Sequence, residues 1–220
     1  MKKLNLKALS ISAVLLASTA LSSSVFAGGL KYQVSITNLT KSIQFTPIMV
    51  AAHKSKVNLF ELGQPASDEL GRVAEGGDTS GVAAMFNGYH DQVQSVAGLL
   101  NGGETATLTF EGLSHRTKFT LASMLLPTND AFVAGQSLSL KKKQRTQTFY
   151  LRTYDAGTET NSETCATIPG PTCGGEPFSP NDEGEGYVYI HSGIHGIGDL
   201  SASTYTWNDP VLKVTITRMH

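Results

Sequence analysis

The sequence lacks the signature motifs of common enzyme families. Its 220 residues contain no Gly-x-Ser-x-Gly elbow, no His-Glu-x-x-His zinc motif, no phosphate-cradling Gly-Lys-Ser/Thr run and no dinucleotide fingerprint. It also has no internal repeat, coiled-coil heptad or low-complexity tail. Enzymatic activity is therefore a minor hypothesis. In its concrete form it is an exported hydrolase of the glycosidase kind, which would need a carboxylate pair such as Glu61 and Asp68 across a cleft.

Charge is sparse and almost balanced. The chain has 17 basic and 18 acidic residues, and charged residues make up 16% of the composition. If Lys2, Lys3 and Lys7 leave with an amino-terminal signal, the mature chain has 14 basic and 18 acidic residues, which is a net charge of −4. This balance gives no support for a nucleic-acid partner.

The longest apolar run is at the amino terminus, from residue 8 to about residue 26, and it follows Lys2 and Lys3. Its end, Val25-Phe26-Ala27 before Gly28, is typical of a secretory signal with a small-x-small cleavage site. The many serines in the run make it a poor membrane span, so we expect no stable span after cleavage. The sequence predicts a signal peptide over 1–27 and a single periplasmic or secreted domain over 28–220.

Cysteine is almost absent. Cys165 and Cys173 are the two cysteines of the chain and are separated by seven residues. An exported compartment permits oxidation, so a local disulfide is the expected state. A zinc site is the alternative, although no further Cys or His flanks the pair.

Periodicity predicts a mostly β protein. Apolar residues alternate with polar ones from Tyr32 to Ile36 and again from Leu212 to Ile216, which predicts half-buried strands near both ends of the chain. Further strands are expected at 105–110, 118–126, 137–141 and 146–151, with 141–145 as the charged tip of a hairpin.

Between about residues 58 and 100 the apolar residues recur at helical spacing, beginning with Leu59, Phe60 and Leu62, while glycines and Pro65 interrupt them. Short helices are expected there, with Ser67 and Asp78 as amino-terminal caps.

Two acidic turns follow strand-like runs. Pro127-Thr128-Asn129-Asp130 comes after the run 122–126, and Tyr154-Asp155-Ala156-Gly157-Thr158-Glu159 comes after 148–151. If the two runs pair, Asp130, Asp155 and Glu159 converge, and their hard oxygen atoms suit calcium. The other interpretation is that these aspartates cap backbone amides in ordinary turns.

Several blocks of the chain resemble the spondin amino-terminal domain found in F-spondin and mindin. The two acidic turns lie within residues 123–135 and 154–159 and resemble the signature turns of that family. Residues 32–40 and 45–53 before them, and residues 210–218 after them, resemble further blocks of the family in the same order.

The resemblance implies an antiparallel β-sandwich similar to calcium-dependent phospholipid-binding domains, with a calcium ion where the two turns meet. It places the calcium ligands on Asp130, Asp155 and Glu159, the last of which stands where the family usually has Asp. It further implies recognition or adhesion through an unknown extracellular or cell-envelope protein or glycan.

Other polar groups leave alternatives open. His191 and His195 suggest a metal pair, but residues four apart on a strand are ~13 Å from each other, so structural roles are expected. No role is assigned to His53. The run 182–185 is either a second cation site or a solvated acidic loop. Lys141, Lys142 and Lys143 are either a solvated turn or a site for phosphate or an anionic surface.

Overall fold

The structure is a computed structural model that describes residues 28–179 and 183–219. The predicted signal peptide, residues 1–27, lies outside the described residues. In the described part of the chain, no helix has the length and apolar character needed to cross a bilayer.

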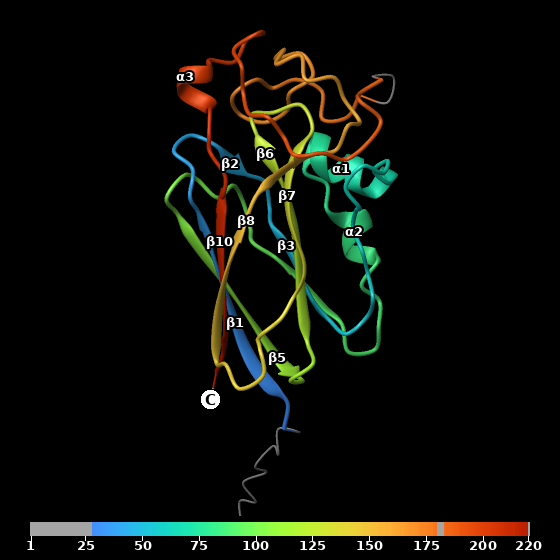
Figure 1. The fold of residues 1–220 in the computed structure, drawn as a ribbon, viewed down its shortest axis with the longest axis vertical. Helices are drawn as coiled ribbons and strands as arrows, with labels where there is room; N and C mark the ends of the chain where they lie inside the picture. The colour runs from blue at the N-terminus through green and yellow to red at the C-terminus, as the bar shows by residue number, and fades with distance from the viewer. Residues whose placement is uncertain (1–27, 180–182, 220) are drawn as a thin grey trace, which may run out of the picture.

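Two antiparallel sheets face each other and form a sandwich (Figure 1). The first sheet has the strand order β5, β1, β10, β8, with bounds Thr105–Leu113, Leu30–Asn38, Leu212–Arg218 and Thr146–Leu151. The second sheet has the order β4, β3, β6, β7, β9, with bounds Gln92–Ser95, Met49–His53, Lys118–Leu126, Ala131–Leu138 and Thr153–Asp155. A two-residue strand, β2 (Gln44–Phe45), pairs with β6. The predicted mostly β sandwich is confirmed.

The strands predicted near both ends of the chain form, and they lie side by side at the centre of the first sheet. β1 and β10 pair antiparallel, with Val34 opposite Ile216 and Ile36 opposite Val214. These apolar side chains are buried, while the residues between them are half-buried or exposed, which is the period of two expected for a sheet with one wet face. Burial of one face of each strand fixes the register, because a slip of one residue would expose the whole apolar set.

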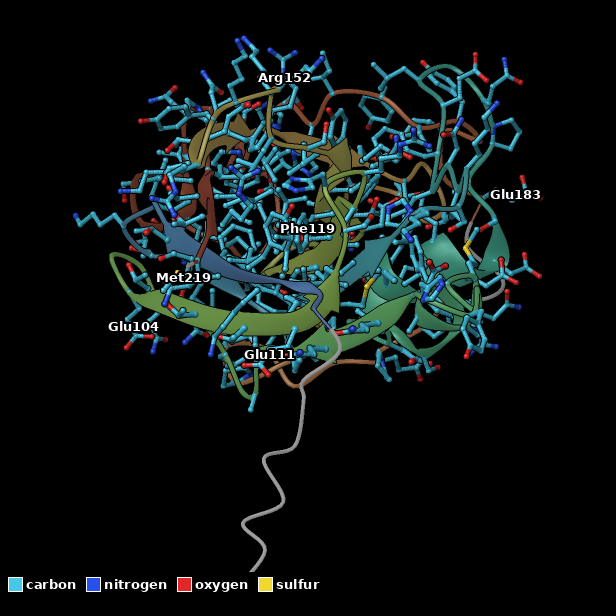
Figure 2. All side chains as sticks on the ribbon, turned by 90° about the horizontal axis from the view of Figure 1, so that it is seen from below. Glu104, Glu111, Phe119, Arg152, Glu183 and Met219 are labelled. Atoms are coloured by element: carbon cyan, nitrogen blue, oxygen red, sulfur yellow. A yellow bond between two sulfur atoms is a disulfide. The ribbon has the colours of Figure 1, made fainter. Side chains whose placement is uncertain are left out.

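The core lies between the sheets, and a second apolar layer lies outside the second sheet. Phe119 belongs to the core and is surrounded by side chains in Figure 2, where Glu104 and Arg152 lie at the edge. On the other face of the second sheet, helix α1 (Asp68–Gly76) packs Leu70 and Val73 against the sheet. This covering explains why every residue of β3 and nearly every residue of β6 is buried.

The region from 58 to 100 follows the prediction in part. It contains α1 and a second short helix, α2 (Ser80–Ala84), but it also contains strand β4, which the sequence did not reveal. The expected helical turn at Leu59 and Phe60 is a loop. The side chain of Gln136 satisfies this loop, because it accepts from the Leu59 amide at 2.7 Å and donates to the Phe60 carbonyl at 3.1 Å.

The two predicted helix caps have different outcomes. Ser67 is the N-cap of α1, and its hydroxyl accepts from the Leu70 amide at 3.3 Å. Asp78 is not the cap of α2, since that position belongs to Thr79. Asp78 lies one residue before this cap, and its carboxylate accepts a hydrogen bond from the Ser80 amide at 2.9 Å.

The predicted hairpin around residues 141–145 is wrong. β7 ends at Leu138 in the second sheet, whereas β8 belongs to the first, so the segment between them crosses from one sheet to the other. Of the expected strand over 137–141, Ser137 and Leu138 belong to the end of β7, and residues 139–141 are not in a strand. A register shift between Phe119 and Leu121, where Ser137 adopts a φ of 53°, precedes the last pair of β6 with β7, Phe119 opposite Leu138.

Candidate metal centre

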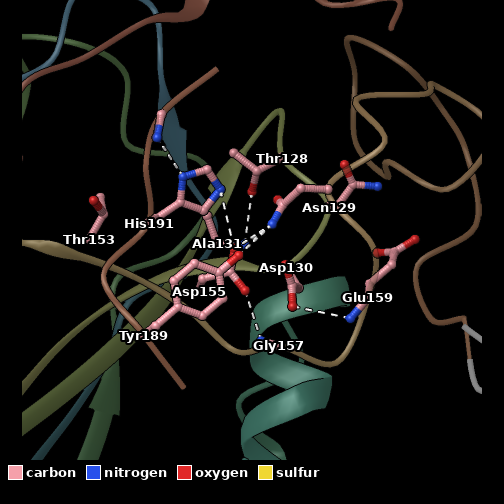
Figure 3. A network of polar contacts seen from close by, with 12 residues as sticks. Thr128, Asn129, Asp130, Ala131, Thr153, Asp155, Gly157, Glu159, Tyr189 and His191 are labelled. Carbon is pink, nitrogen blue, oxygen red and sulfur yellow. Dashed lines mark hydrogen bonds and ion pairs between the residues drawn. The ribbon is translucent and has the colours of Figure 1, made fainter. Parts of the chain in front are cut away.

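The two acidic turns meet at one end of the sandwich, although not by the predicted pairing. The runs 122–126 and 148–151 lie in different sheets, so they do not pair. The turns converge because β7 starts at Ala131 and pairs with β9, with Ala131 opposite Asp155. Asp130 and Asp155 therefore lie close together (Figure 3). We call this end, formed by residues 127–130 and 155–163, the acidic end.

Asp130 is fully buried and is held by the second turn. Its Oδ2 atom accepts from the backbone amides of Thr158 at 2.8 Å and Glu159 at 3.2 Å. Its Oδ1 atom is buried without a hydrogen-bond partner. A carboxylate oxygen left dry and unpaired costs free energy, so this atom is well placed to bind a cation.

Asp155 is also fully buried, and both of its oxygens have partners. Oδ1 accepts from the Gly157 amide at 2.8 Å, and Oδ2 accepts from the Asn161 side chain at 2.6 Å. Gly157 is required here, since its φ is 66° and a Cβ atom would lie 2.3 Å from the carbonyl oxygen of Tyr187. The turn therefore combines a cap, as the ordinary-turn interpretation expects, with a position beside Asp130.

The neighbouring aspartates shift each other's protonation. Burial, followed by the charge of Asp155, raises the pKa of Asp130 well above its ordinary value. Burial also raises the pKa of Asp155, against the hydrogen bonds from Asn161 and Gly157. Two neighbouring buried carboxylates resist ionisation of both groups unless a cation neutralises their charge.

Glu159 takes part through two different groups. Its backbone amide is directed at Asp130 in Figure 3, and its buried carboxylate has no hydrogen-bond partner on either oxygen. Burial, followed by the charge of Glu75 on α1, raises the pKa of Glu159 to about 7. Glu75 itself is buried and accepts from the Ser179 amide at 2.9 Å. The carboxylate of Glu159 thus lies within the electrostatic reach of α1.

Of the three predicted ligands, the structure brings Asp130 and Asp155 close together, but it does not bring the Glu159 carboxylate to them (Figure 3). Among residues 28–179 and 183–219, no group of three His, Cys, Asp or Glu side chains is arranged to hold a metal ion. The donor chemistry nevertheless suits calcium, because Asp130 Oδ1 and both oxygens of Glu159 are hard, buried and unpaired. Asp130 and Asp155 would hold the ion, and its charge would offset their two carboxylates, whereas the Glu159 carboxylate points away from this pair (Figure 3).

His191 and Tyr189 adjoin the aspartates and were not found from the sequence as parts of this centre. His191 Nε2 is 3.8 Å from Asp155 Oδ2, and its Nδ1 accepts from the Gly193 amide at 2.9 Å. Burial lowers the pKa of His191 to about 4, so the ring is neutral at physiological pH. The Tyr189 hydroxyl accepts from Asn161 at 3.0 Å. A bridge between Tyr189 and Asp155 brings this distant segment to the site, which local patterns cannot show.

The other histidines have separate structural surroundings. The side chain of His195 is 55% exposed and lies 3.8 Å from Glu163, whereas His191 is buried against the ring of Trp207, so the two do not form a pair around one ion. His53 is buried, and its two ring nitrogens lie 2.9 Å from Thr120 Oγ1 and 3.0 Å from the carbonyl oxygen of Ser55.

Glu163 holds two loops beside the acidic turns through hydrogen bonds, a role that the sequence did not indicate. Its buried carboxylate accepts from the amides of His195, Gly196 and Ile197 at 2.5, 2.7 and 2.9 Å. Its own amide donates to Asn129 Oδ1 at 3.0 Å, next to Asp130. One residue therefore connects the segment 195–197, through its carboxylate, with the first acidic turn, through its backbone amide.

The predicted disulfide is confirmed, and the zinc alternative for the two cysteines is wrong. Cys165 and Cys173 form a bond of 1.99 Å with their Cα atoms 4.7 Å apart. The bridge packs against a small cluster of Ile168, Ile194 and Leu200. It closes the loop that follows the second acidic turn.

The remaining acidic candidates are peripheral. Asp182 lies outside the described residues, while Glu185 is exposed and its charge contributes to raising the pKa of Asp130. Glu61 and Asp68 are both exposed. A small cavity of about 160 Å³ takes in Asp68 and Glu75 but not Glu61, so this cavity does not join the pair proposed for a hydrolase.

Comparison with known families matches residues 35–172 to the family described as Spondin_N, the spondin N-terminal domain. This segment contains both acidic turns and covers more than half of the chain. No curated protein matches the chain at a significant level. The chain belongs to the spondin N-terminal domain family.

Proposed function

We propose that this protein is an exported, calcium-binding β-sandwich module that recognises an extracellular or cell-envelope protein or glycan. Membership of the spondin family and the disulfide support an extracellular module. The observation that carries the calcium proposal is the set of unpaired, fully buried carboxylate oxygens on Asp130 and Glu159. A divalent cation is the simplest partner for such atoms.

The acidic end also offers a surface for recognition. Three large apolar side chains, Tyr187, Ile190 and Ile197, are between 47% and 70% exposed on the segment that borders the centre. Tyr189 in that segment bridges to Asp155, and Ile197 donates its amide to Glu163. Calcium would hold these loops in one conformation and so reduce the entropy lost when a partner binds.

The test combines calcium titration with partner capture. We expect calorimetry to show one calcium ion bound, with an affinity of about 10⁻⁴–10⁻³ M, and a rise of the melting temperature once calcium exceeds that constant. Asp130→Asn and Glu159→Gln should remove both effects. Capture of a partner from envelope and culture fractions should weaken in chelator and in Asp130→Asn.

Glu61→Gln is the matched control, because Glu61 is exposed and the structure gives it no side-chain partner in the described residues. It should bind calcium and partner like the wild type. Absence of a calcium-dependent heat or melting shift would refute the metal centre. Turnover of a glycan or peptide substrate that disappears in Glu61→Gln would favour the hydrolase alternative.

A further inference from the structure

Four chain segments with basic residues meet at the end of the sandwich opposite the acidic end. These are the start of β1, the end of β10, the turn between β5 and β6, and the connection from β7 to β8 (Figure 1). The Arg218 amide donates to the Arg145 carbonyl at 2.7 Å, and the Met219 amide donates to the Lys31 carbonyl at 2.8 Å. Backbone bonds therefore hold the segments together. We call this the basic end.

A cavity of about 460 Å³ lies at the basic end. Its polar lining comes from the side chains of Tyr32, His115, Lys141, Lys142, Lys143 and Arg218. None of the described lining residues carries a carboxylate. Within residues 28–179 and 183–219, the lysines and Arg218 have no acidic partner, and the ion pair at this end joins Lys31 to Glu111 at 2.8 Å. The cavity thus collects positive charge on a protein whose mature net charge is negative.

The cationic groups stand on fixed backbone. Arg218 lies in β10 opposite Tyr32, and its Nη1 atom is 3.0 Å from His115 Nδ1. The Tyr32 hydroxyl is anchored on the Ser114 carbonyl at 3.1 Å. The lysines occupy a tight turn in which the Gln144 amide donates to the Lys141 carbonyl at 3.0 Å, and the Lys141 amide donates to the Gln147 side chain at 3.0 Å. Because these hydrogen bonds hold the turn, its three lysines line the same cavity.

We propose that the cavity of the basic end binds a phosphate group. A guanidinium and several ammonium groups around one cavity match the several oxygens and up to two negative charges of phosphate, whereas one arginine fork satisfies a carboxylate. The volume exceeds that of a single anion, which leaves room for the group that carries the phosphate. The ligand is a soluble phosphorylated molecule or an anionic lipid headgroup, and the two share this chemistry.

The experiment is a titration of the ¹⁵N-labelled mature protein with inorganic phosphate, at constant ionic strength and in chelator to prevent precipitation of calcium phosphate. We expect saturable shifts of the amide signals of residues 141–145 and 218, and no saturable shifts with chloride. Lys142→Gln combined with Lys143→Gln should weaken the affinity about ten-fold, since charge-assisted hydrogen bonds to phosphate are lost.

A second arm distinguishes the source of the phosphate. Co-sedimentation with vesicles of phosphatidylglycerol and phosphatidylcholine, compared with phosphatidylcholine alone, tests the headgroup. Vesicle binding that inorganic phosphate displaces identifies a headgroup ligand, and phosphate binding without vesicle binding identifies a soluble one. Both results support the site.

The matched control is Lys41→Gln combined with Lys56→Gln, which removes the same charge from exposed positions outside the cavity. The proposal is overturned if phosphate gives no saturable shifts and if the lysine-turn variant, Lys142→Gln with Lys143→Gln, binds vesicles as the wild type does. It is also overturned if the control weakens binding as much as the lysine-turn variant. Because the measurement is made without calcium, its outcome is independent of the metal centre.

Discussion

At the scale of single residues, Glu159 differs from an ordinary buried acid. Neither of its carboxylate oxygens has a hydrogen-bond partner of good geometry in the described part of the chain. Burial raises its pKa and outweighs the nearby polar groups of Thr167, Ser179 and Asn129, which lower it. The neighbouring Asp155, in contrast, is satisfied by Gly157 and Asn161. The two acids therefore respond differently to calcium removal, since only Glu159 keeps a dry, unpaired carboxyl.

The pH dependence of Glu159 gives a direct prediction. Its pKa in the fold is about 7, above the ordinary 4.5, so the protonated group stabilises the calcium-free fold below about pH 4.5. That contribution is lost as the pH rises through 7. In chelator at pH 8, Glu159→Gln should therefore be more stable than the wild type by about 1–3 kcal/mol in urea unfolding, because it removes an unpaired buried charge.

The difference should shrink toward zero at pH 4.5, and saturating calcium at pH 8 should reverse its sign. His191 also titrates, with its pKa lowered to about 4, but it is common to both proteins and cancels in the comparison. Glu61→Gln should show no such dependence. A stability difference that is constant from pH 4.5 to 8 would contradict the assignment.

The sequence predicted the acidic residues of this centre better than the residues that support them. Asp130, Asp155 and Glu159 stand in recognisable turns. Glu163 and His191 act on the same loops through contacts with segments 32 or more residues away in the chain, such as Glu163 with His195 to Ile197 and His191 with Asp155. Neither local pattern nor spacing carries that information.

At the scale of elements, β7 determines the site. Its first residue, Ala131, pairs with Asp155. After its last residue, Leu138, the chain leaves the second sheet and crosses to β8 in the first. The sequence predicted β1, β6 and β10 because alternation or a long apolar run marks them. It placed the strand after β6 at 137–141, because the region 131–135 is uniformly apolar or small and buried on both faces, and so shows no period.

The disulfide loop is an element whose contribution can be measured separately. Replacement of Cys165 and Cys173 by serine should lower the free energy of unfolding by about 2.5 kcal/mol, the chain-entropy value for so short a loop. The two sheets should remain folded, since neither cysteine belongs to the sandwich core. Chemical denaturation of oxidised, reduced and serine proteins checks this. Equal stability of the oxidised and serine proteins would show that the bridge contributes nothing.

At the scale of the whole molecule, the sandwich separates two ends of opposite charge. The acidic end has the buried carboxylates of Asp130 and Asp155, and the basic end has Arg218 and the lysine turn. The paired strands between them enclose an apolar core. They should therefore fold without an ion at either end, although an ion bound to the folded state adds to the free energy of unfolding.

This separation predicts where calcium changes the dynamics. In hydrogen exchange followed by mass spectrometry, calcium should slow exchange in residues 127–131 and 156–163, because the ion would hold both acidic turns. Exchange in residues 141–145, which lie at the other end, should not change, and exchange in β1 and β10 should slow only as far as calcium raises the free energy of global unfolding. Asp130→Asn should exchange as the calcium-free wild type does in both media, while Glu61→Gln should keep the calcium response. Slowing of equal size in the acidic turns and in the strands would mean that calcium acts only through the global fold, and an unchanged acidic end would remove the basis for calcium-controlled recognition.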